Sequence, residues 1–145
     1  MVDDLYQETI LDHSKRPRNF HIMQDANRTA DGYNPLCGDK LKLYLKVEND
    51  IVQDASFEGC GCAISTASAS LMTESLKGKT KDEALHLLEK FHDLLTQDAA
   101  STQDLGKLVV FCGVRDYPGR VKCATLAWHT LKSALNGTGD LTTTE

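Results

Sequence analysis

The stretch Leu41-Lys42-Leu43-Tyr44-Leu45-Lys46-Val47-Glu48-Asn49-Asp50 indicates how the middle of this chain folds. Apolar and polar side chains alternate over residues 41–48, which is the pattern of a strand with one buried face. Asn49 and Asp50 favour a turn, and residues 51–57 have the composition of a second strand. We therefore expect an antiparallel hairpin over residues 41–57, with a third strand just before Pro35.

Helical patterns flank the hairpin on both sides. Residues 2–13 are loosely periodic and end before Pro17, and the polar residues 15–30 that follow predict an extended loop. After the hairpin, small residues dominate positions 63–72. They predict a closely packed helix that begins at or just after Cys62.

Three more helices are expected towards the C-terminus. Thr80 and Glu83 have the spacing of a capping box before a helix, whose apolar face comprises Ala84, Leu87, Leu88, Phe91, Leu94 and Leu95. A polar connector over residues 96–103 is followed by a short helix ended by Gly113, whose apolar stripe comprises Leu105, Leu108, Val109 and Cys112. We interpret Cys112 as a core residue. Pro118 marks the start of the last helix and Gly137 its end, with Val121, Ala124, Trp128, Leu131 and Leu135 on one face.

Size and composition predict one domain. The chain has 145 residues, 41% of them hydrophobic and 26% charged, which is typical of a globular domain with its own core. We expect an α+β fold over residues 1–145, in which about three antiparallel strands pack against several helices. Residues 4–136 would form the core and residues 138–145 a frayed tail.

Charge and hydropathy exclude several classes of partner. The net charge of −5 does not favour binding to nucleic acid or to an anionic membrane. No apolar run approaches the roughly 18–20 residues that span a bilayer, and the N-terminus lacks the apolar region of a signal peptide. We therefore expect a cytoplasmic protein whose five cysteines are reduced.

The cysteines carry the strongest functional signal. Cys37 and Asp39 lie in a turn before the first hairpin strand, Cys62 is expected at a helix start, and Cys123 in the first turn of the last helix. Helix N-termini favour the thiolate, the form that binds metal. Three thiolates and a carboxylate form a tetrahedral set that zinc accepts. The spacing also allows a structural interpretation, in which Cys37 and Asp39 are turn or cap residues and Cys62 and Cys123 are small buried side chains.

Three cysteine blocks resemble a known family, the U-type iron–sulfur assembly proteins. The blocks are Asn34-Pro35-Leu36-Cys37-Gly38-Asp39, Gly61-Cys62-Ala63-Ile64-Ser65-Thr66-Ala67-Ser68-Ala69-Ser70 and Arg120-Val121-Lys122-Cys123-Ala124-Thr125-Leu126-Ala127-Trp128. Leu5-Tyr6, Ile10-Leu11-Asp12-His13 and Pro17-Arg18-Asn19 are similar to the N-terminal signature of that family. The chain resembles the SufU branch, because Lys122 stands where IscU proteins carry a histidine ligand and the segment between Cys62 and Cys123 is long.

The resemblance implies a function and a set of site residues. It implies that Cys37, Asp39, Cys62 and Cys123 bind Zn²⁺, that a SufS-type cysteine desulfurase donates sulfur, and that Cys37 receives it as a persulfide. Arg120 would help to dock the desulfurase. The same resemblance leaves a scaffold function open, in which a transient [2Fe-2S] cluster or iron is held and passed to downstream assembly proteins or apo-acceptors. A purely structural zinc adaptor is the third alternative.

Cys60 departs from a simple SufU pattern. IscU proteins place their middle cysteine at the position of Cys60 and SufU proteins at that of Cys62, and this chain has both. We interpret Cys60 as a bystander, with a fourth sulfur ligand as the alternative. The histidines lack ligand spacing and are expected to be surface or packing residues; they are His13, His21, His86, His92 and His129.

Overall fold

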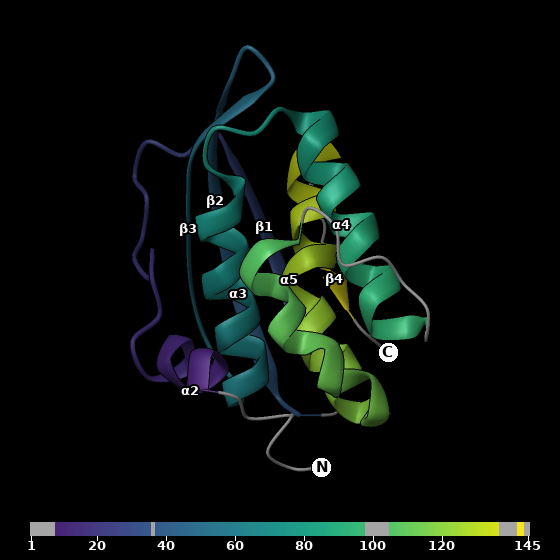
Figure 1. The fold of residues 1–145 in the computed structure, drawn as a ribbon. Helices are drawn as coiled ribbons and strands as arrows, with labels where there is room; N and C mark the ends of the chain where they lie inside the picture. Colours follow the sequence, from purple (N-terminus) through teal and green to yellow (C-terminus); the bar gives the residue numbers. More distant parts are fainter. Residues whose placement is uncertain (1–7, 36, 98–104, 137–141, 144–145) are drawn as a thin grey trace.

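The computed structural model describes residues 8–35, 37–97, 105–136 and 142–143 (Figure 1). In chain order the elements are α2 (Glu8–Lys15), β1 (Arg28–Asn34), β2 (Asp39–Glu48), β3 (Ile51–Cys60), α3 (Ala63–Leu76), α4 (Lys81–Thr96), the 3₁₀ helix η1 (Gly106–Asp116), α5 (Pro118–Asn136) and β4 (Thr142–Thr143). Helices α3 and α5 cover one face of the sheet, and α4 and η1 pack against α5 on the side away from the strands. The α+β expectation is confirmed.

The predicted hairpin forms as β2 and β3. The two strands pair antiparallel, with Leu43 opposite Phe57. Asn49 and Asp50 both adopt positive φ, 54° and 61°, as the favoured two-residue hairpin turns require. Leu41, Leu43 and Leu45 are buried, so the period-two pattern identified the core face correctly.

The strand expected before Pro35 is β1, which pairs antiparallel with β2 and completes the expected three strands. The sheet order is β3-β2-β1-β4, and the two-residue β4 runs parallel to β1. A frayed tail was expected in this part of the chain. Of residues 138–145, only 142–143 lie within the described residues.

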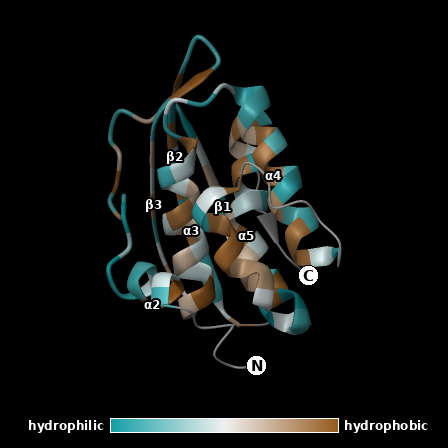
Figure 2. Ribbon diagram, in the orientation of Figure 1, coloured by the Kyte–Doolittle hydropathy of each residue, from teal (hydrophilic) through white to brown (hydrophobic). Residues whose placement is uncertain are grey.

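The core lies between the sheet and the helices. Figure 2 shows hydrophobic segments on the helix faces that turn inward and hydrophilic ones on the outside. Phe91 of α4 stacks on Trp128 of α5 with ring centroids 4.7 Å apart, and Phe111 of η1 meets Phe91 edge-on at 5.5 Å. Stacked and edge-on pairs of this kind add to the stabilisation from area burial. These aromatic rings join the outer helices to α5.

Three predicted helix starts are confirmed, and the first residue of α5 is Pro118 as expected. Cys62 is the N-cap of α3, and its side chain accepts a hydrogen bond from the Ser65 N–H group. Thr80 caps α4 in a reciprocal capping box with Glu83, with distances of 3.0 and 3.1 Å. The capping box depends on two residues three apart, which is why the sequence reveals it, whereas the run of small residues after Cys62 predicted the start of α3.

The interpretation of Cys112 as a core residue is wrong, because this side chain is exposed. The segment forms a 3₁₀ helix that continues past Gly113 to Asp116. In a 3₁₀ helix residues three apart lie in one column. The buried column is therefore Leu108, Phe111 and Val114, and Cys112 falls on the column beside it.

The expected place of Cys123 also needs correction. Helix α5 begins at Pro118, so Cys123 is its sixth residue and lies in the second turn rather than the first. The unpaired N–H groups of the helix start are therefore not available to its thiol. The pKa of the Cys123 thiol is instead raised by the neighbouring Cys62 and by burial.

The remaining expectations concern segments at the edges of elements. The N-terminal helix is described over Glu8–Lys15 and ends before Pro17 as expected, and its first expected residues lie outside the described part. The loop after it ends earlier than predicted, because β1 begins at Arg28. Most of the connector over residues 96–103, and the helix stop at Gly137, also lie outside the described residues.

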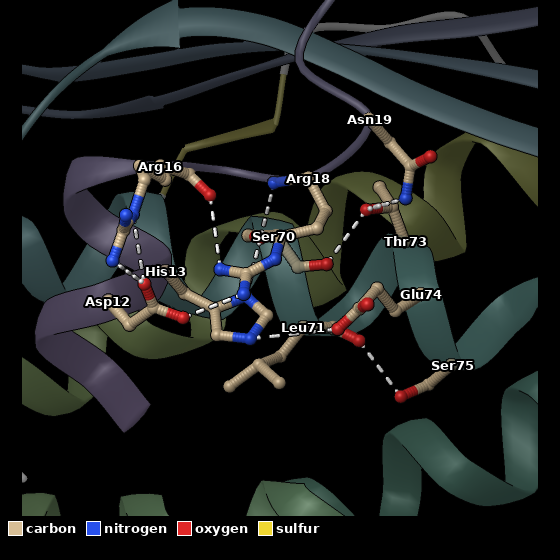
Figure 3. A network of polar contacts seen from close by, with 10 residues as sticks. All are labelled: Asp12, His13, Arg16, Arg18, Asn19, Ser70, Leu71, Thr73, Glu74 and Ser75. Carbon is tan, nitrogen blue, oxygen red and sulfur yellow. Dashed lines mark hydrogen bonds and ion pairs between the residues drawn. The ribbon is translucent and has the colours of Figure 1, made fainter. Parts of the chain in front are cut away.

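A polar network anchors α2 to α3 (Figure 3). The His13 Nδ1 atom lies 2.7 Å from the Ser70 hydroxyl oxygen, which also accepts a hydrogen bond from the Arg18 N–H group at 2.8 Å. The other ring nitrogen of His13 lies 3.6 Å from Glu74. His13 is 2% exposed, so it is a satisfied core residue. Among the described helices, none is long and apolar enough to cross a lipid bilayer.

Candidate metal centre

Three chain segments meet at one end of the sheet. The turn between β1 and β2 carries Cys37, and the last pair of that ladder, Asn34 with Asp39, closes the turn. Gly38 has a φ of 72°, and its N–H group donates to the Asn34 carbonyl at 2.8 Å. Glycine adopts such a positive φ without steric cost, because it has no Cβ atom. The turn between β3 and α3 brings Cys62 to the same place, and α5 brings Cys123.

Cys37, Asp39 and Cys123 form a compact group of ligand atoms. One atom from each side chain lies within 4.8 Å of the other two. The Cys123 and Cys37 sulfurs are 3.3 Å apart. Asp39 and Cys123 are buried, whereas Cys37 is exposed. Two members of the group are therefore buried, and the third, the Cys37 thiol, faces solvent.

Cys62, the N-cap of α3, lies beside this group but is not one of its three members. Its sulfur lies 4.0 Å from Asp39 Oδ2 and accepts the Ser65 N–H group at 3.4 Å. A hydrogen bond from the Cys123 thiol, assisted by the Ser65 N–H group, lowers the pKa of Cys62 to about 6. The same interaction, together with burial, raises the pKa of Cys123. Of these two sulfurs, Cys62 is thus the one that loses its proton more readily.

Arg120 supplies positive charge at the exposed thiol. It lies three residues before Cys123 on α5, and its Nη1 atom is 3.8 Å from the Cys37 sulfur. The guanidinium group therefore places positive charge beside the exposed Cys37 sulfur. The sequence singled out Arg120 for docking a partner, and the structure places it directly beside the proposed nucleophile.

The donor set fits zinc. Zinc takes thiolate and carboxylate ligands at about 2.0–2.3 Å, so two ligand atoms on one tetrahedral ion lie about 3.3–3.8 Å apart. The atoms of Cys37, Asp39 and Cys123 are already within 4.8 Å of one another. Cys62 is close enough to Asp39 to be a fourth donor. To bind one tetrahedral ion, the four side chains, and Cys62 above all, would have to move closer together.

Comparison with known proteins identifies the family. The family model described as the NifU-like N terminal domain matches residues 5–135. The chain belongs to this family. The match confirms the resemblance to U-type iron–sulfur assembly proteins drawn from the cysteine blocks.

Curated relatives of this NifU-like chain have two kinds of name. The zinc-dependent sulfurtransferase SufU of Bacillus subtilis (strain 168) is 43% identical over 135 residues, which is 92% of this chain and 91% of the relative. The iron–sulfur cluster assembly scaffold protein IscU of Streptococcus pyogenes serotype M1 is 41% identical over 135 residues, covering 92% of this chain and 84% of the relative. Sequence similarity alone therefore favours neither name strongly.

Solved structures share the fold of this NifU-like chain. A crystal structure of a protein assigned as an iron–sulfur cluster assembly scaffold for the SUF system, from Fervidobacterium islandicum AW-1, has a TM-score of 0.87 at 38% identity. The similarity covers 93% of this chain and 99% of that one. The N-terminal part of a NifU-like protein from Brucella abortus has a TM-score of 0.86 at 25% identity, covering 94% of this chain and 95% of that one.

Cys60 lies apart from the ligand group. It is the last residue of β3, pairs with Lys40 of β2 and is exposed. Adjacent residues on a strand point to opposite faces. Since Asp39 is buried at the site, Lys40 and its partner Cys60 belong to the other face of the sheet. The geometry favours the bystander interpretation, which stays a prediction.

Sequence reasoning missed two residues at the site. The Asn34 amide contacts both Asp39 and Cys123, and Gly61 packs against the Asp39 carboxylate. Both lie inside the quoted cysteine blocks. The only indication in the sequence is their position, because Asn34 lies three residues before Cys37 and Gly61 directly precedes Cys62.

Proposed function

We propose that this chain acts in iron–sulfur cluster assembly as a zinc-dependent sulfurtransferase that accepts sulfur from a SufS-type cysteine desulfurase in the cytoplasm. The observation that carries the proposal is the asymmetry of the cysteine group. Cys37 is exposed, whereas Asp39 and Cys123 behind it are buried. One thiol can therefore meet a partner's active site while the others stay in place.

The proposed zinc ligands are Cys37, Asp39, Cys62 and Cys123. A bound zinc ion would supply positive charge that keeps the coordinating thiols deprotonated at neutral pH. The chain contributes part of this effect by itself at Cys62, whose pKa the Cys123 thiol and the Ser65 N–H group already lower. The carboxylate ligand is the member that differs from a closed, all-cysteine structural site.

The proposed reaction is a displacement at sulfur. The Cys37 thiolate attacks the terminal sulfur of the desulfurase persulfide, a new sulfur–sulfur bond forms on Cys37, and the desulfurase thiolate leaves. The sulfur–sulfur bond of the donor breaks as the new one forms, so the step needs no external oxidant or reductant. Arg120 would stabilise negative charge at Cys37 and contact the desulfurase.

The test is transfer of sulfur from cysteine through the desulfurase. We expect wild-type protein to carry one extra sulfur on Cys37 by mass spectrometry and to stimulate cysteine turnover. Cys37→Ala should abolish both effects. Cys112→Ser is the matched control, because Cys112 is also an exposed thiol but lies on η1 outside the ligand group. Stimulation that survives in Cys37→Ala would reject the proposal.

A cluster scaffold is the second candidate function. The three thiols at the site and the IscU-named relatives favour it, since thiolate-rich sites bind zinc and iron–sulfur clusters alike. It predicts that a [2Fe-2S] cluster reconstituted on the chain transfers to an apo-acceptor faster than iron and sulfide supplied alone. Equal rates would exclude the scaffold function.

A further inference from the structure

Asn34 lies behind the ligand group rather than in it. It is the last residue of β1, it pairs with Asp39 at the start of β2, and its exposure is 0%. A buried amide must find hydrogen-bond partners, because leaving its donors unpaired costs free energy. The identity of those partners indicates what the residue does.

The Asn34 amide nitrogen bridges two of the proposed ligands. It donates to Asp39 Oδ2 at 3.1 Å and to the Cys123 sulfur at 3.4 Å. The two acceptors come from different elements, Asp39 from β2 and Cys123 from α5. Both would be anionic as metal ligands. One side chain thus fixes the spacing between a ligand from β2 and a ligand from α5.

The second oxygen of Asp39 is held as well. The Cys62 backbone N–H group donates to Asp39 Oδ1 at 2.8 Å. A Cβ atom on Gly61 would lie 2.5 Å from the same oxygen, a separation that no real Cβ contact tolerates. Because Gly61 has no side chain, the Asp39 carboxylate can lie close enough to the turn between β3 and α3 to accept the Cys62 N–H group.

We propose that Asn34 is a positioning residue of the metal site, which holds the Asp39 carboxylate and the Cys123 sulfur at the separation that the metal requires. The proposal rests on the proposed zinc site. Donation from a neutral amide offsets repulsion between two adjacent anionic ligands and fixes the orientation of the carboxylate. Loss of such an outer hydrogen bond typically weakens metal binding about 10- to 100-fold.

The test is the rate at which zinc-loaded protein releases Zn²⁺ to an excess of a chromogenic chelator. Asn34→Asp is nearly isosteric but replaces the donor with a second carboxylate, and Asn34→Ala removes the side chain. We expect both variants to release zinc about 10- to 100-fold faster than wild type. Gly61→Ala should have the same effect with Asn34 intact, because the added methyl group displaces the carboxylate.

The matched control is Asn27→Ala. The Asn27 side chain makes two hydrogen bonds to the Val47 backbone, of 2.7 and 2.8 Å, near the opposite end of β2. This variant should unfold at a lower temperature than wild type and release zinc within about twofold of the wild-type rate. A general loss of stability is thereby separated from a defect at the site.

The outcomes distinguish this inference from the proposed function. Unchanged zinc release in folded Asn34→Asp and Gly61→Ala overturns the inference, even if sulfur transfer to wild type is normal. Faster release in these variants supports it, even if wild type accepts no sulfur and the sulfurtransferase proposal fails. A wild-type protein that retains no zinc contradicts both.

Discussion

At the scale of single residues, the five cysteines of this chain fall into distinct environments. Cys37, Cys60 and Cys112 are exposed, Cys62 is half-buried, and Cys123 is buried. Only one exposed thiol, Cys37, belongs to the group of close ligand atoms found among the described residues. Exposure and ligand geometry are thus separate properties here, and both are needed to choose the nucleophile.

These environments predict a labelling order in zinc-loaded, folded protein treated with iodoacetamide. Cys60 and Cys112 should be alkylated first, because they are exposed and lie outside the ligand group. Cys123 should be alkylated last, since it is buried and would be held by the metal. Peptide mass spectrometry over a time course measures the order. Protection of Cys60 that disappears with zinc removal would instead make Cys60 a ligand.

At the scale of elements, local signals and packing each stabilise a different helix. The capping box of α4 satisfies backbone groups at its first turn through Thr80 and Glu83. The short helix α2 depends on tertiary contacts, because His13 reaches Ser70 on α3. The eight residues described for α2 would be too few to form a stable helix on their own.

The cap of α4 can be tested with Thr80→Ala. Removing the hydroxyl leaves the Glu83 N–H group without its capping acceptor, which costs about 0.5–2 kcal/mol. Urea denaturation should show a lower midpoint with an unchanged m-value. Thr80→Ser, which keeps the hydroxyl, should recover most of the loss. An alanine variant as stable as wild type would show that the cap contributes nothing.

His13 predicts a pH dependence of stability. Burial lowers the pKa of His13 below its ordinary value, against the raising effects of Glu74 and Asp12, while Arg18 and Lys107 lower it further. The unfolded chain therefore takes up a proton at a pH where the folded chain does not. The stability from neutral His13 is fully present above about pH 6.5 and falls as the pH drops towards the folded pKa.

The measurement is thermal unfolding of wild type and His13→Gln across pH 5–8. Both proteins share the other titrating groups, so the difference between their stabilities isolates His13. Wild type should lose stability relative to His13→Gln below about pH 6.5. The glutamine variant should be less stable at neutral pH, because the buried contact with Ser70 is altered. A constant difference over the whole range would contradict this account.

At the scale of the whole molecule, the candidate metal centre joins segments that are distant in sequence. It brings together the turn between β1 and β2, the turn between β3 and α3, and helix α5. In the folded state the helices hold these segments against the sheet. A ligand that binds only this arrangement stabilises the entire fold by linkage.

Removal of zinc should therefore lower global stability. Binding at a thousandfold excess over Kd contributes about 4 kcal/mol. Scanning calorimetry should show a lower Tm after chelation, restored by Zn²⁺, and a much smaller zinc response in Cys62→Ala. Equal melting temperatures with and without chelator in wild type would argue against a tight site.

The sequence by itself determined the local structure of this protein. The alternation in β2, the turn at Asn49, the cap at Thr80 and the helix start at Cys62 all depend on residues within about four positions of one another. The cysteine blocks likewise carried the family, which the match over residues 5–135 confirmed. Because these features depend on neighbouring residues in the sequence, periodicity and capping rules predict them.

Only the tertiary structure decided which side chains meet. The 3₁₀ geometry of η1 turned Cys112 outward, and the packing of α5 buried Cys123 beside Cys37 and Asp39. The contact of Asn34 with Cys123 spans 89 positions along the chain. Such contacts follow from strand register and helix packing, which short-range patterns do not encode. The sequence therefore supplied the ligand candidates, whereas the fold determined their separation, burial and protonation.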